Sequence, residues 1–445
     1  MFDLADQIDS ILPTAIEGRV LRTSGTTIAA GDFPAPLGAQ VEIARHGDEP
    51  LCGEVVGFDR DETLLAPLGT LAGVQHGQRV RMTRTQSSVR VGPSLLGRVV
   101  NAHGTPIDRG PAPLLERRTP LDRQAPSPVD RPAIDEPLST GIRAIDALLT
   151  CGRGQRMGIF SGSGVGKSVL MGLMARNSSA DVNVIGLIGE RGREVNEFIE
   201  RDLGPEGLAR SVIVVATSDE PALVRTRAAM TATAIAESFR DEGRDVLLMM
   251  DSLTRFALAQ REIGLAAGEP PATRAFPPSV FAALPKLVER AGRAPAGSIT
   301  AFYSVLVESD DANEPIADAV RGLLDGHVWL SRRLASRSHY PAIDILESVS
   351  RLMHRITTAE HRQAAATLRE LLAALRDHED LINVGAYRPG SHAMLDVAMK
   401  MRDWVDAFLR QDMNESSSLD AAKAALAELH HTAIETRENL TTRRS

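Results

Sequence analysis

One glycine-rich segment of the chain has the spacing of a phosphate-binding loop, between an apolar run and a helical pattern. Its residues are Ser161, Gly162, Ser163, Gly164, Val165, Gly166, Lys167, Ser168 and Val169. Glycines let backbone N–H groups turn inward around phosphate oxygens, at a helix N-terminus that already favours anions. Lys167 would reach the β- and γ-phosphates of a nucleotide, and Ser168 would ligand Mg²⁺. Ser161 stands where this motif usually has its first glycine.

The alternative interpretation of this segment is a glycine-rich turn between a strand and a helix, without a ligand. Lysine occurs at only four positions, and the remaining basic residues are arginine. Lys167 is therefore a lysine at the one position where the motif requires a compact ammonium group.

Carboxylates follow two other apolar runs and could complete the site. Asp251 ends the run 245–251, where a buried parallel strand would present it to the water shell of Mg²⁺. The alternative for Asp251 is a helix N-cap, which Ser252 could provide equally well. Glu190 follows the run 182–188 and could polarise the water that attacks the γ-phosphate, the alternative being a solvated charged turn. We expect the strand 182–188 to lie beside the strand that carries the phosphate loop.

Composition excludes several classes of protein. The chain has 445 residues, 43% of them hydrophobic and 24% charged, which is typical of a folded protein with two to four domains. A net charge of -8 and an aromatic fraction of 4% argue against a nucleic-acid-binding surface. Cys52 and Cys151 fit neither a disulfide framework nor a metal site. We see no signal peptide and no membrane span, and we expect a cytoplasmic protein that docks peripherally on a membrane complex.

Composition and hydrophobic periodicity divide the chain into four regions. Residues 1–17 have an amphipathic helical pattern, and residues 18–85 contain short β-type runs typical of a small antiparallel barrel or sandwich. Residues 86–354 carry alternating strand and helix patterns, which indicate a mostly parallel, doubly wound α/β sheet. Within them, 106–137 holds eight prolines and is expected to be an extended surface connector. Residues 355–445 show only helical patterns.

The expected elements of the α/β region can be placed by their apolar runs. The expected strands are 156–160, 182–188, 212–216, 246–250, 298–305 and 327–330, and the expected helices are 167–176, 194–202, 221–240 and 277–290. The segment 340–351 indicates, from its residues alone, only a loop that begins with a proline and contains an arginine.

Together these features resemble the catalytic subunits of rotary ATP synthases and, more closely, the ATPases of flagellar and type III protein export systems. The resemblance covers essentially the whole chain, as barrel, RecA-like nucleotide domain and helical domain. The segment 341–350 fits the family signature, and 269–281 and 408–411 resemble the export branch. Residues 381–387 with 390–391 favour the flagellar branch, although His392 falls where the family usually has aspartate.

The resemblance implies that the chain hydrolyses ATP with Mg²⁺, and it implies a role for each matching side chain. Glu190 would orient the attacking water, and Arg191 and Arg255 would contact or lie near the γ-phosphate. Glu194 and Asp251 would support the Mg²⁺ water shell, and Tyr340 would stack on adenine. Arg351 would be an arginine finger that acts on the nucleotide of the neighbouring subunit.

The resemblance also implies partners. Non-catalytic synthase subunits carry glutamine at the position of Glu190, whereas this chain has both Glu190 and Arg351, so identical subunits could form a ring, six by analogy. Residues 1–17 would dock a stator-type regulator, and 308–315 would face a coiled-coil stalk in the ring pore or form a solvated acidic loop. The export gate and substrate–chaperone complexes would be further partners, without nucleic acid.

Three alternatives to a flagellar export ATPase are considered. An ATPase of a virulence type III secretion system, or injectisome, differs little in sequence. An RNA-translocating ring helicase would need a basic, aromatic N-terminal barrel, which residues 18–85 do not provide. A rotary synthase subunit in a mixed ring is disfavoured by the segment 269–281.

Overall fold

The N-terminal part of the chain folds into a closed six-stranded antiparallel barrel in the computed structural model, which describes residues 15–46, 49–307 and 314–442. The strands, in the order β1-β2-β5-β4-β3-β6, are β1 (Glu17–Ser24), β2 (Thr27–Gly31), β3 (Gln40–Ile43), β4 (Leu51–Asp59), β5 (Glu62–Pro67) and β6 (Arg79–Arg84). Alternating side chains such as Val20, Val41 and Val80 fill its interior. The expected barrel is confirmed.

Only the end of the expected N-terminal helix falls within the described residues. Ala15 and Ile16 have no regular structure, and Glu17 begins β1, so the helical interpretation is wrong for these three residues. Glu17 pairs with Arg81 of β6, and this barrel hydrogen bonding replaces a helical turn. Residues 1–14 lie outside the described residues.

The central domain is built on a nine-stranded sheet, ordered β19-β18-β12-β17-β15-β13-β14-β8 with β16 paired to β17. Its strands are β8 (Arg98–Asn101), β12 (Arg156–Ser161), β13 (Val182–Glu190), β14 (Ser211–Thr217), β15 (Asp245–Asp251), β16 (Gly292–Arg293), β17 (Ser298–Leu306), β18 (Gly326–Leu330) and β19 (Ile343–Ser350). All pairings are parallel except those of β16 and β19. The expected doubly wound α/β sheet is confirmed.

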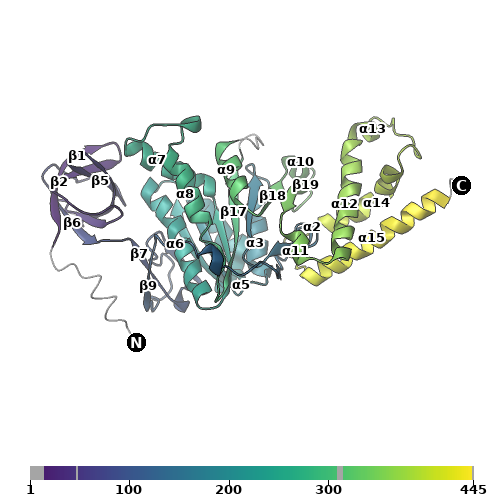
Figure 1. The fold of residues 1–445 in the computed structure, drawn as a ribbon, viewed down its shortest axis with the longest axis horizontal. Coiled ribbons are helices and arrows are strands. Elements are labelled where there is room, and N and C mark those ends of the chain that lie inside the picture. The colour runs from purple at the N-terminus through teal and green to yellow at the C-terminus, as the bar shows by residue number, and fades with distance from the viewer. Residues whose placement is uncertain (1–14, 47–48, 308–313, 443–445) are drawn as a thin grey trace.

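Helices cover both faces of this sheet (Figure 1). The helices are α2 (Arg143–Leu148), α3 (Lys167–Asn177), α4 (Gly192–Glu197), a π-helix (Phe198–Leu203), α5 (Gly204–Ala209), α6 (Ala222–Asp241), α7 (Leu253–Ala266), α8 (Pro278–Val288), α9 (Pro315–Leu323), α10 (Arg332–Ser336) and α11 (Met353–Ile356). Ile185 and its neighbours at every second position pack with α3, whereas Val184 packs with α6. Because successive strand residues point to opposite faces, β13 contributes to two hydrophobic cores.

The C-terminal region is helical, as expected. Its helices are α12 (Ala359–Asp377), α13 (Glu379–Asn383), α14 (Ala393–Leu409) and α15 (Leu419–Thr442). The apolar sides of α12, α14 and α15 pack together, through residues such as Leu371, Met401 and Leu426, and extend the core that contains α3. Across the described ranges, no helix is long and apolar enough to cross a lipid bilayer.

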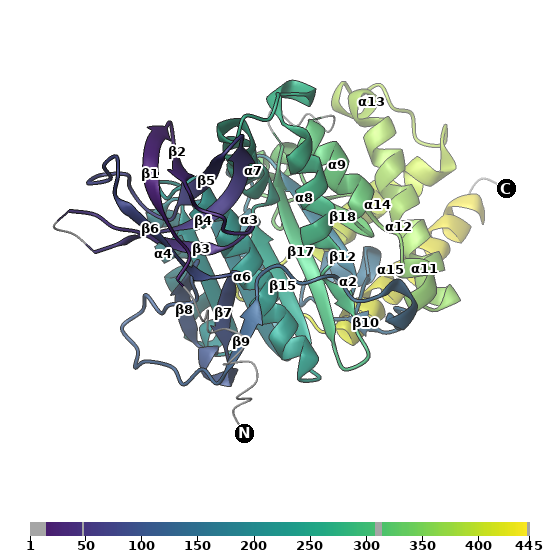
Figure 2. The ribbon, with the colours of Figure 1, turned by 60° about the vertical axis from the view of Figure 1, so that its left-hand side comes forward.

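The proline-rich connector contains two short strands. The strand β9 (Arg117–Pro120) pairs with β7 (Ser88–Val91), and β10 (Pro137–Leu138) pairs with β11 (Cys151–Gly152). Figure 2 shows the chain running from β9 to β10 across the nucleotide domain. Arg131 fastens this stretch by donating to the Ala291 carbonyl at 2.9 Å. Two 3₁₀ turns, Pro93–Leu95 and Pro128–Asp130, complete the region before α2.

Two details of the sheet differ from the sequence-based expectations. The strand β13 does not lie beside β12, because β17 and β15 separate them. The segment 340–351 is not only a loop, since it includes β19, which pairs antiparallel with β18. Ile343 and Ile345 are buried, whereas Glu347 is exposed next to an irregularity in the pairing of β19 with β18.

Candidate active site

The phosphate loop, residues 161–168, joins β12 to α3 at the carboxyl edge of the sheet. Gly164 and Gly166 adopt left-handed backbone conformations with φ of 76° and 89°, which glycine adopts without steric strain. Val165 is buried in the core beneath the loop, and Val169 packs against the same core. Ser168 is exposed at the first turn of α3. The loop is therefore anchored from below, and its polar groups stand at the open N-terminus of a helix.

Lys167 forms an ion pair with Asp251 at the end of β15. Lys167 Nζ contacts Asp251 Oδ1, and the two side chains are 13% and 6% exposed. The Ser304 hydroxyl of β17 donates to the same oxygen at 2.6 Å. Ser252, not Asp251, caps α7 by accepting from the Arg255 amide at 3.3 Å. Asp251 is thus held at the site by Lys167 and Ser304 rather than by a capping role.

Glu190 ends β13 and lies in the electrostatic field of the same pair. Burial raises the pKa of Glu190 to about 7, and the Asp251 charge and a hydrogen bond with Glu194 act in the same direction. The positive charges of Lys167 and Arg255 oppose this shift. A carboxyl group with a pKa near neutrality, beside a phosphate loop, can take up or release a proton in the working pH range.

Two arginines, Arg191 and Arg255, come shortly after Glu190 and Asp251 in the sequence. The Arg255 side chain packs along Gly189, where an added Cβ would meet Arg255 Cβ at 3.1 Å. Arg255 Nε is buried without a hydrogen-bond partner among the described residues. Arg191 is 75% exposed, and its Nη1 lies 3.3 Å from Glu194 Oε1. The site thus presents one half-buried arginine, Arg255, whose buried Nε has no partner among the described residues, and one arginine, Arg191, whose guanidinium is exposed to solvent.

Tyr340 and Arg332 reach the phosphate loop from the segment that follows β18. The Tyr340 ring is 46% exposed, and its edge carbons lie 3.5 Å from where a Cβ on Gly166 would stand. The Arg332 guanidinium lies against Gly162, where an added Cβ would come within 2.5 Å of Nε. A side chain at position 162 would collide with Arg332, so the glycine permits this close approach.

Sequence reasoning missed Arg332 and Ser304. Arg332 follows β18, the neighbour of the phosphate-loop strand, and its place just after an apolar run could have indicated the contact. Ser304 lies inside a strand, and only the strand order places β17 between Lys167 and Asp251. The sequence has no local pattern that would single out Ser304.

Arg351 does not join this cluster within one chain. Ser161, at the start of the phosphate loop, pairs with Leu330 at one end of β18, whereas Ser350 pairs with Gly326 at the other. Four residues of strand separate these ends, about 13 Å at 3.3 Å per residue. The exposed Arg351 therefore lies at the edge of the sheet opposite the phosphate loop of its own chain.

The residues at the carboxyl edge fit a magnesium nucleotide. The two left-handed glycines, the unused donor of Arg255 and the Lys167 ammonium suit phosphate oxygens. Ser168, Glu194 and Asp251 offer oxygen ligands, and Mg²⁺ usually keeps several waters, so one or two protein oxygens are enough. Among the described residues no cluster of three His, Cys, Asp or Glu side chains is arranged to hold a metal alone. A metal here would be held jointly with the nucleotide.

Two family models match the nucleotide domain and the C-terminal helices. The nucleotide-binding domain of the ATP synthase alpha/beta family matches residues 141–350, which contain the phosphate loop, Glu190 and Asp251. The T3SS EscN ATPase C-terminal domain matches residues 357–428. The two matches meet at the boundary between the α/β sheet and the C-terminal helices.

Curated relatives match nearly the full length. The flagellum-specific ATP synthase of Bacillus subtilis (strain 168) is 50% identical over 419 residues, 93% of this chain and 94% of the relative. The type 3 secretion system ATPase of Xanthomonas euvesicatoria is 53% identical over 404 residues, 91% of each chain. Identity to the two branches is similar, so overall identity does not separate a flagellar from a secretion role.

Solved structures match this chain over a similar share of its length. The assembled ATPase EscN from the type III secretion system of enteropathogenic E. coli has a TM-score of 0.87 and 46% identity, covering 93% of this chain and 100% of that chain. EscN in complex with its central stalk EscO has a TM-score of 0.86 with the same identity and coverage.

Proposed function

The chain belongs to the ATP synthase alpha/beta family, as an ATPase of its flagellar and type III secretion branch, and we propose that it drives flagellar protein export with Mg-ATP. The observation that supports hydrolysis is the meeting of Lys167, Asp251 and Glu190 at the carboxyl edge of the sheet. The flagellar role is supported by residues 381–387 and 390–391 and by flagellum-specific relatives from several bacteria.

Each residue of the cluster has a proposed task. The backbone of the phosphate loop, residues 161–168, cradles the phosphates, and Lys167 exchanges its Asp251 partner for the β- and γ-phosphate oxygens. Glu190 orients and polarises the attacking water. Arg191 and Arg255 contact the γ-phosphate or released phosphate. Tyr340 stacks on adenine beside the loop that it already contacts through Gly166.

Ser168, Asp251 and Glu194 are the proposed oxygen ligands of Mg²⁺ or of its water shell. When bound, Mg²⁺ would neutralise negative charge on the β- and γ-phosphate oxygens. The protein's own part is to hold these oxygens in place. Ser304 fixes Asp251, and the first turn of α3 fixes Ser168.

Arg351 is proposed to act on the nucleotide of a neighbouring subunit. Its position at the opposite edge of the sheet supports this, because it cannot reach its own phosphate loop. A subunit that offers a phosphate loop at one edge and a finger at the other can form heterologous contacts, and such contacts give a ring when the rotation between subunits closes. We propose a homo-oligomeric ring of six subunits, by analogy with the family.

The remaining partners are also proposals. The solved EscN complex has a central stalk, EscO, and we propose that a coiled-coil stalk occupies the pore of this ring too. The loop proposed to face it, 308–315, lies outside the described residues up to Asn313. A stator-type regulator at residues 1–17, the export gate and substrate–chaperone complexes complete the set, without nucleic acid. These roles imply a cytoplasmic location, peripheral to a membrane apparatus.

We propose that the functional units follow the limits drawn from the sequence. These are a docking segment at 1–17, a barrel at 18–85, an ATPase domain at 86–354 and a helical domain at 355–445.

Deletion of the gene in its own host tests the flagellar role. We expect loss of swimming and of filament protein in the medium, with rescue by the wild-type gene and no rescue by the Lys167→Ala variant. Unchanged motility together with lost secretion of virulence proteins would assign the chain to an injectisome. Export that continues unchanged through both systems would refute the proposal.

A further inference from the structure

The segment between β18 and β19 lies against the phosphate loop at two points. The Arg332 guanidinium lies against Gly162, and the Tyr340 ring approaches Gly166. The helix in this segment, α10, has only five residues, too few to be stable without contacts to other elements. The position of Arg332 on the loop therefore depends on what holds α10.

The first residue of α13, Glu379, holds α10 near its start and just beyond its end. Arg333 Nη1 donates to Glu379 Oε2 at 2.6 Å, and Arg337 Nη2 donates to Oε1 at 2.8 Å. The two arginines are four residues apart, so they extend from the same side of the helical turn. The hydrogen bond from Arg337 and the charges of both arginines lower the pKa of Glu379, so its carboxylate is ionised at pH 7.

Residues that follow α14 hold the rest of the segment. Arg410 Nη1 donates to the Ser338 carbonyl at 3.3 Å, and the Gln411 backbone N–H donates to the Tyr340 carbonyl at 3.0 Å. Ser338 has a left-handed backbone with φ of 55°, which is strained for a residue with a Cβ. Gln411 is itself fixed to the start of α2, because its side chain accepts from the Arg143 amide at 2.8 Å.

The C-terminal helices are thus joined to the phosphate loop through α10. In Figure 1, α10 lies on the side of the sheet toward α12 and α13. The contacts of Arg333 and Arg337 with Glu379 lie on the C-terminal side of α10, and the contact of Arg332 with Gly162 lies on the side of the phosphate loop. A displacement of α10 would therefore move the guanidinium that lies against the loop.

We propose that Glu379 is a positioning residue for ATP binding. By holding Arg333 and Arg337 it keeps α10 in place, and α10 keeps the Arg332 guanidinium against Gly162. The loop binds phosphate only when its N–H groups point to the same place, and the guanidinium restricts the loop to that arrangement. Glu379 acts through other residues and does not touch the nucleotide. This inference rests on the proposed binding of Mg-ATP at the phosphate loop.

Glu379→Gln tests the inference, because the amide keeps the shape of the side chain and loses its charge. Calorimetric titration with Mg-ADP and steady-state hydrolysis of Mg-ATP are measured on the full chain. We expect the Kd for ADP and the KM for ATP to rise about threefold or more, with kcat nearly unchanged because Lys167 and Glu190 are intact. Exposed ion pairs contribute little to global stability, so the melting temperature should stay the same. Glu62→Gln, which breaks a similarly exposed pair with Arg22 on the barrel, is the matched control and should change none of these values.

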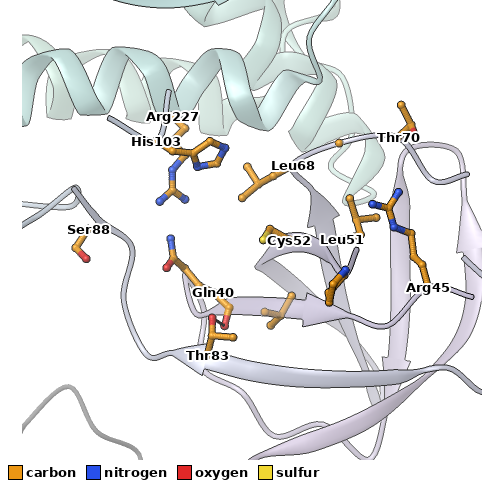
Figure 3. Close-up of a pocket in the computed structure, with 14 residues that line it drawn as sticks. Gln40, Arg45, Leu51, Cys52, Leu68, Thr70, Thr83, Ser88, His103 and Arg227 are labelled. Atoms are coloured by element: carbon orange, nitrogen blue, oxygen red, sulfur yellow. Dashed lines mark hydrogen bonds between the residues drawn. The ribbon is translucent and has the colours of Figure 1, made fainter. Parts of the chain in front are cut away.

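A combined variant tests whether Glu379 acts through Arg332. Arg332→Ala removes the guanidinium from the loop and should raise KM at least as much as Glu379→Gln does. Adding Glu379→Gln to Arg332→Ala should have little further effect, because the contact that Glu379 positions is already lost. Arg45→Ala is the matched control, since Arg45 lies on the barrel, in the wall of the cavity between the barrel and α6 (Figure 3). It should leave KM unchanged and the effect of Glu379→Gln undiminished.

Gly162→Ala displaces the same guanidinium without removing it. The added Cβ would come within 2.5 Å of Arg332 Nε, and Gly162 lacks the left-handed backbone of Gly164 and Gly166, so alanine is compatible with its backbone conformation. KM should rise in Gly162→Ala, and Gly162→Ala should cause no further loss in the Arg332→Ala chain.

The results separate this inference from the proposed function. A wild-type chain that binds no Mg-ADP would overturn both. If the wild-type chain binds Mg-ADP, an unchanged KM in Glu379→Gln, a fall in kcat alone, or additive losses when Glu379→Gln is combined with Arg332→Ala would overturn the positioning role and leave the proposed function intact.

Discussion

At the residue scale, the active-site cluster is already charge-balanced without nucleotide. Lys167 is neutralised by Asp251, and Ser304 holds the same carboxylate oxygen. In the proposed function, phosphate would therefore compete with Asp251 for the ammonium, and the freed carboxylate would support the water shell of Mg²⁺. Glu190 stands in the same field, so changes at Lys167 or Asp251 alter its protonation.

Lys167→Ala should abolish hydrolysis while the protein stays folded. The ammonium serves phosphate, and losing such a group lowers turnover by about 10²–10³-fold or more. Release of phosphate measures turnover, and circular dichroism checks folding. Lys286→Ala, an exposed lysine on α8, is the matched control and should keep wild-type turnover. Wild-type turnover in Lys167→Ala would contradict the phosphate-loop assignment.

Glu190→Gln should bind Mg-ATP normally and turn over poorly. The amide keeps the shape of the side chain and loses the charge that polarises water, a loss of about 10²–10⁴-fold in general-base catalysis. Fluorescent nucleotide binding and single-turnover hydrolysis separate the two effects. Glu197→Gln, a half-exposed carboxylate on α4, should change neither. Normal turnover in Glu190→Gln would show that Glu190 has no catalytic role and belongs only to a solvated charged turn.

The raised pKa of Glu190 also predicts a pH dependence. With a folded-state pKa of about 7 and an ordinary value near 4.3, the folded protein holds this proton over a window in which the unfolded chain has released it. Stability is thus favoured at low pH and declines as pH rises through about 7. The melting temperature of Glu190→Gln should therefore exceed that of wild type by more at pH 8 than at pH 5. In wild type, kcat/KM for ATP should rise through about pH 7, and a flat profile would contradict the assignment.

At the element scale, the apolar runs of the sequence predicted six of the seven parallel strands and the helices α3, α6 and α8, but not the short edge strand β8 or the helix α7. They could not predict strand order, because buried runs such as 246–250 and 298–305 look alike. The insertion of both of these strands between β12 and β13 depends on packing between elements far apart in sequence. The edge strand β19 was missed since Asp344 and Glu347 interrupt its apolar pattern. Arg332 and Ser304 joined the site only through these tertiary neighbours.

A buried ion pair between Glu237 and Arg290 gives an element-scale prediction, because it joins α6 to the end of α8. Arg290 donates to both carboxylate oxygens, at 2.9 and 2.7 Å, and each side chain is 1% exposed. Arg290→Met should destabilise the domain by about 3–5 kcal/mol, since it leaves a buried carboxylate without its main partner. Differential scanning calorimetry measures the change.

The double variant Glu237→Leu with Arg290→Met removes both charges and should recover most of this loss. Arg333→Met, which breaks an exposed pair with Glu379, is the control and should cost under about 1 kcal/mol. A drop for Arg290→Met no larger than the control would show that α6 and α8 are held by apolar packing alone.

At the scale of the whole molecule, the proposed function gives each chain two incomplete halves of a catalytic site. The phosphate loop, Asp251 and Glu190 lie at one edge of the sheet, and Arg351 lies at the other. The homologous EscN has been solved in an assembled form. If the two halves meet only between subunits, the oligomer is the catalytic unit, and a lone chain binds ATP without hydrolysing it efficiently.

Specific activity should therefore rise with protein concentration as subunits associate, and Arg351→Ala should be nearly inactive at every concentration. An arginine finger contributes on the order of 10³–10⁵ in rate in related phosphoryl transfer, by neutralising charge that develops on the γ-phosphate. Phosphate release over a dilution series, with mass photometry on the same samples, relates activity to assembly. Arg355→Ala, an exposed arginine on α11, is the matched control and should retain activity. Activity that is independent of concentration would overturn the shared site.

Mixing Arg351→Ala with Lys167→Ala separates a shared site from a requirement for contact alone. Each variant should be inactive by itself, because one lacks the proposed finger and the other lacks the phosphate-loop ammonium. In a mixed ring, some interfaces pair an intact Lys167 with an intact Arg351 of the neighbour, so partial activity should return in proportion to such interfaces. A doubly substituted chain mixed with wild type supplies the matched comparison, since it dilutes both halves together. If mixed rings form and no activity returns, while the wild-type mixture keeps activity at the same ring composition, the finger does not act between subunits. That outcome would leave the position of Arg351 as a structural feature of the interface rather than part of the chemistry.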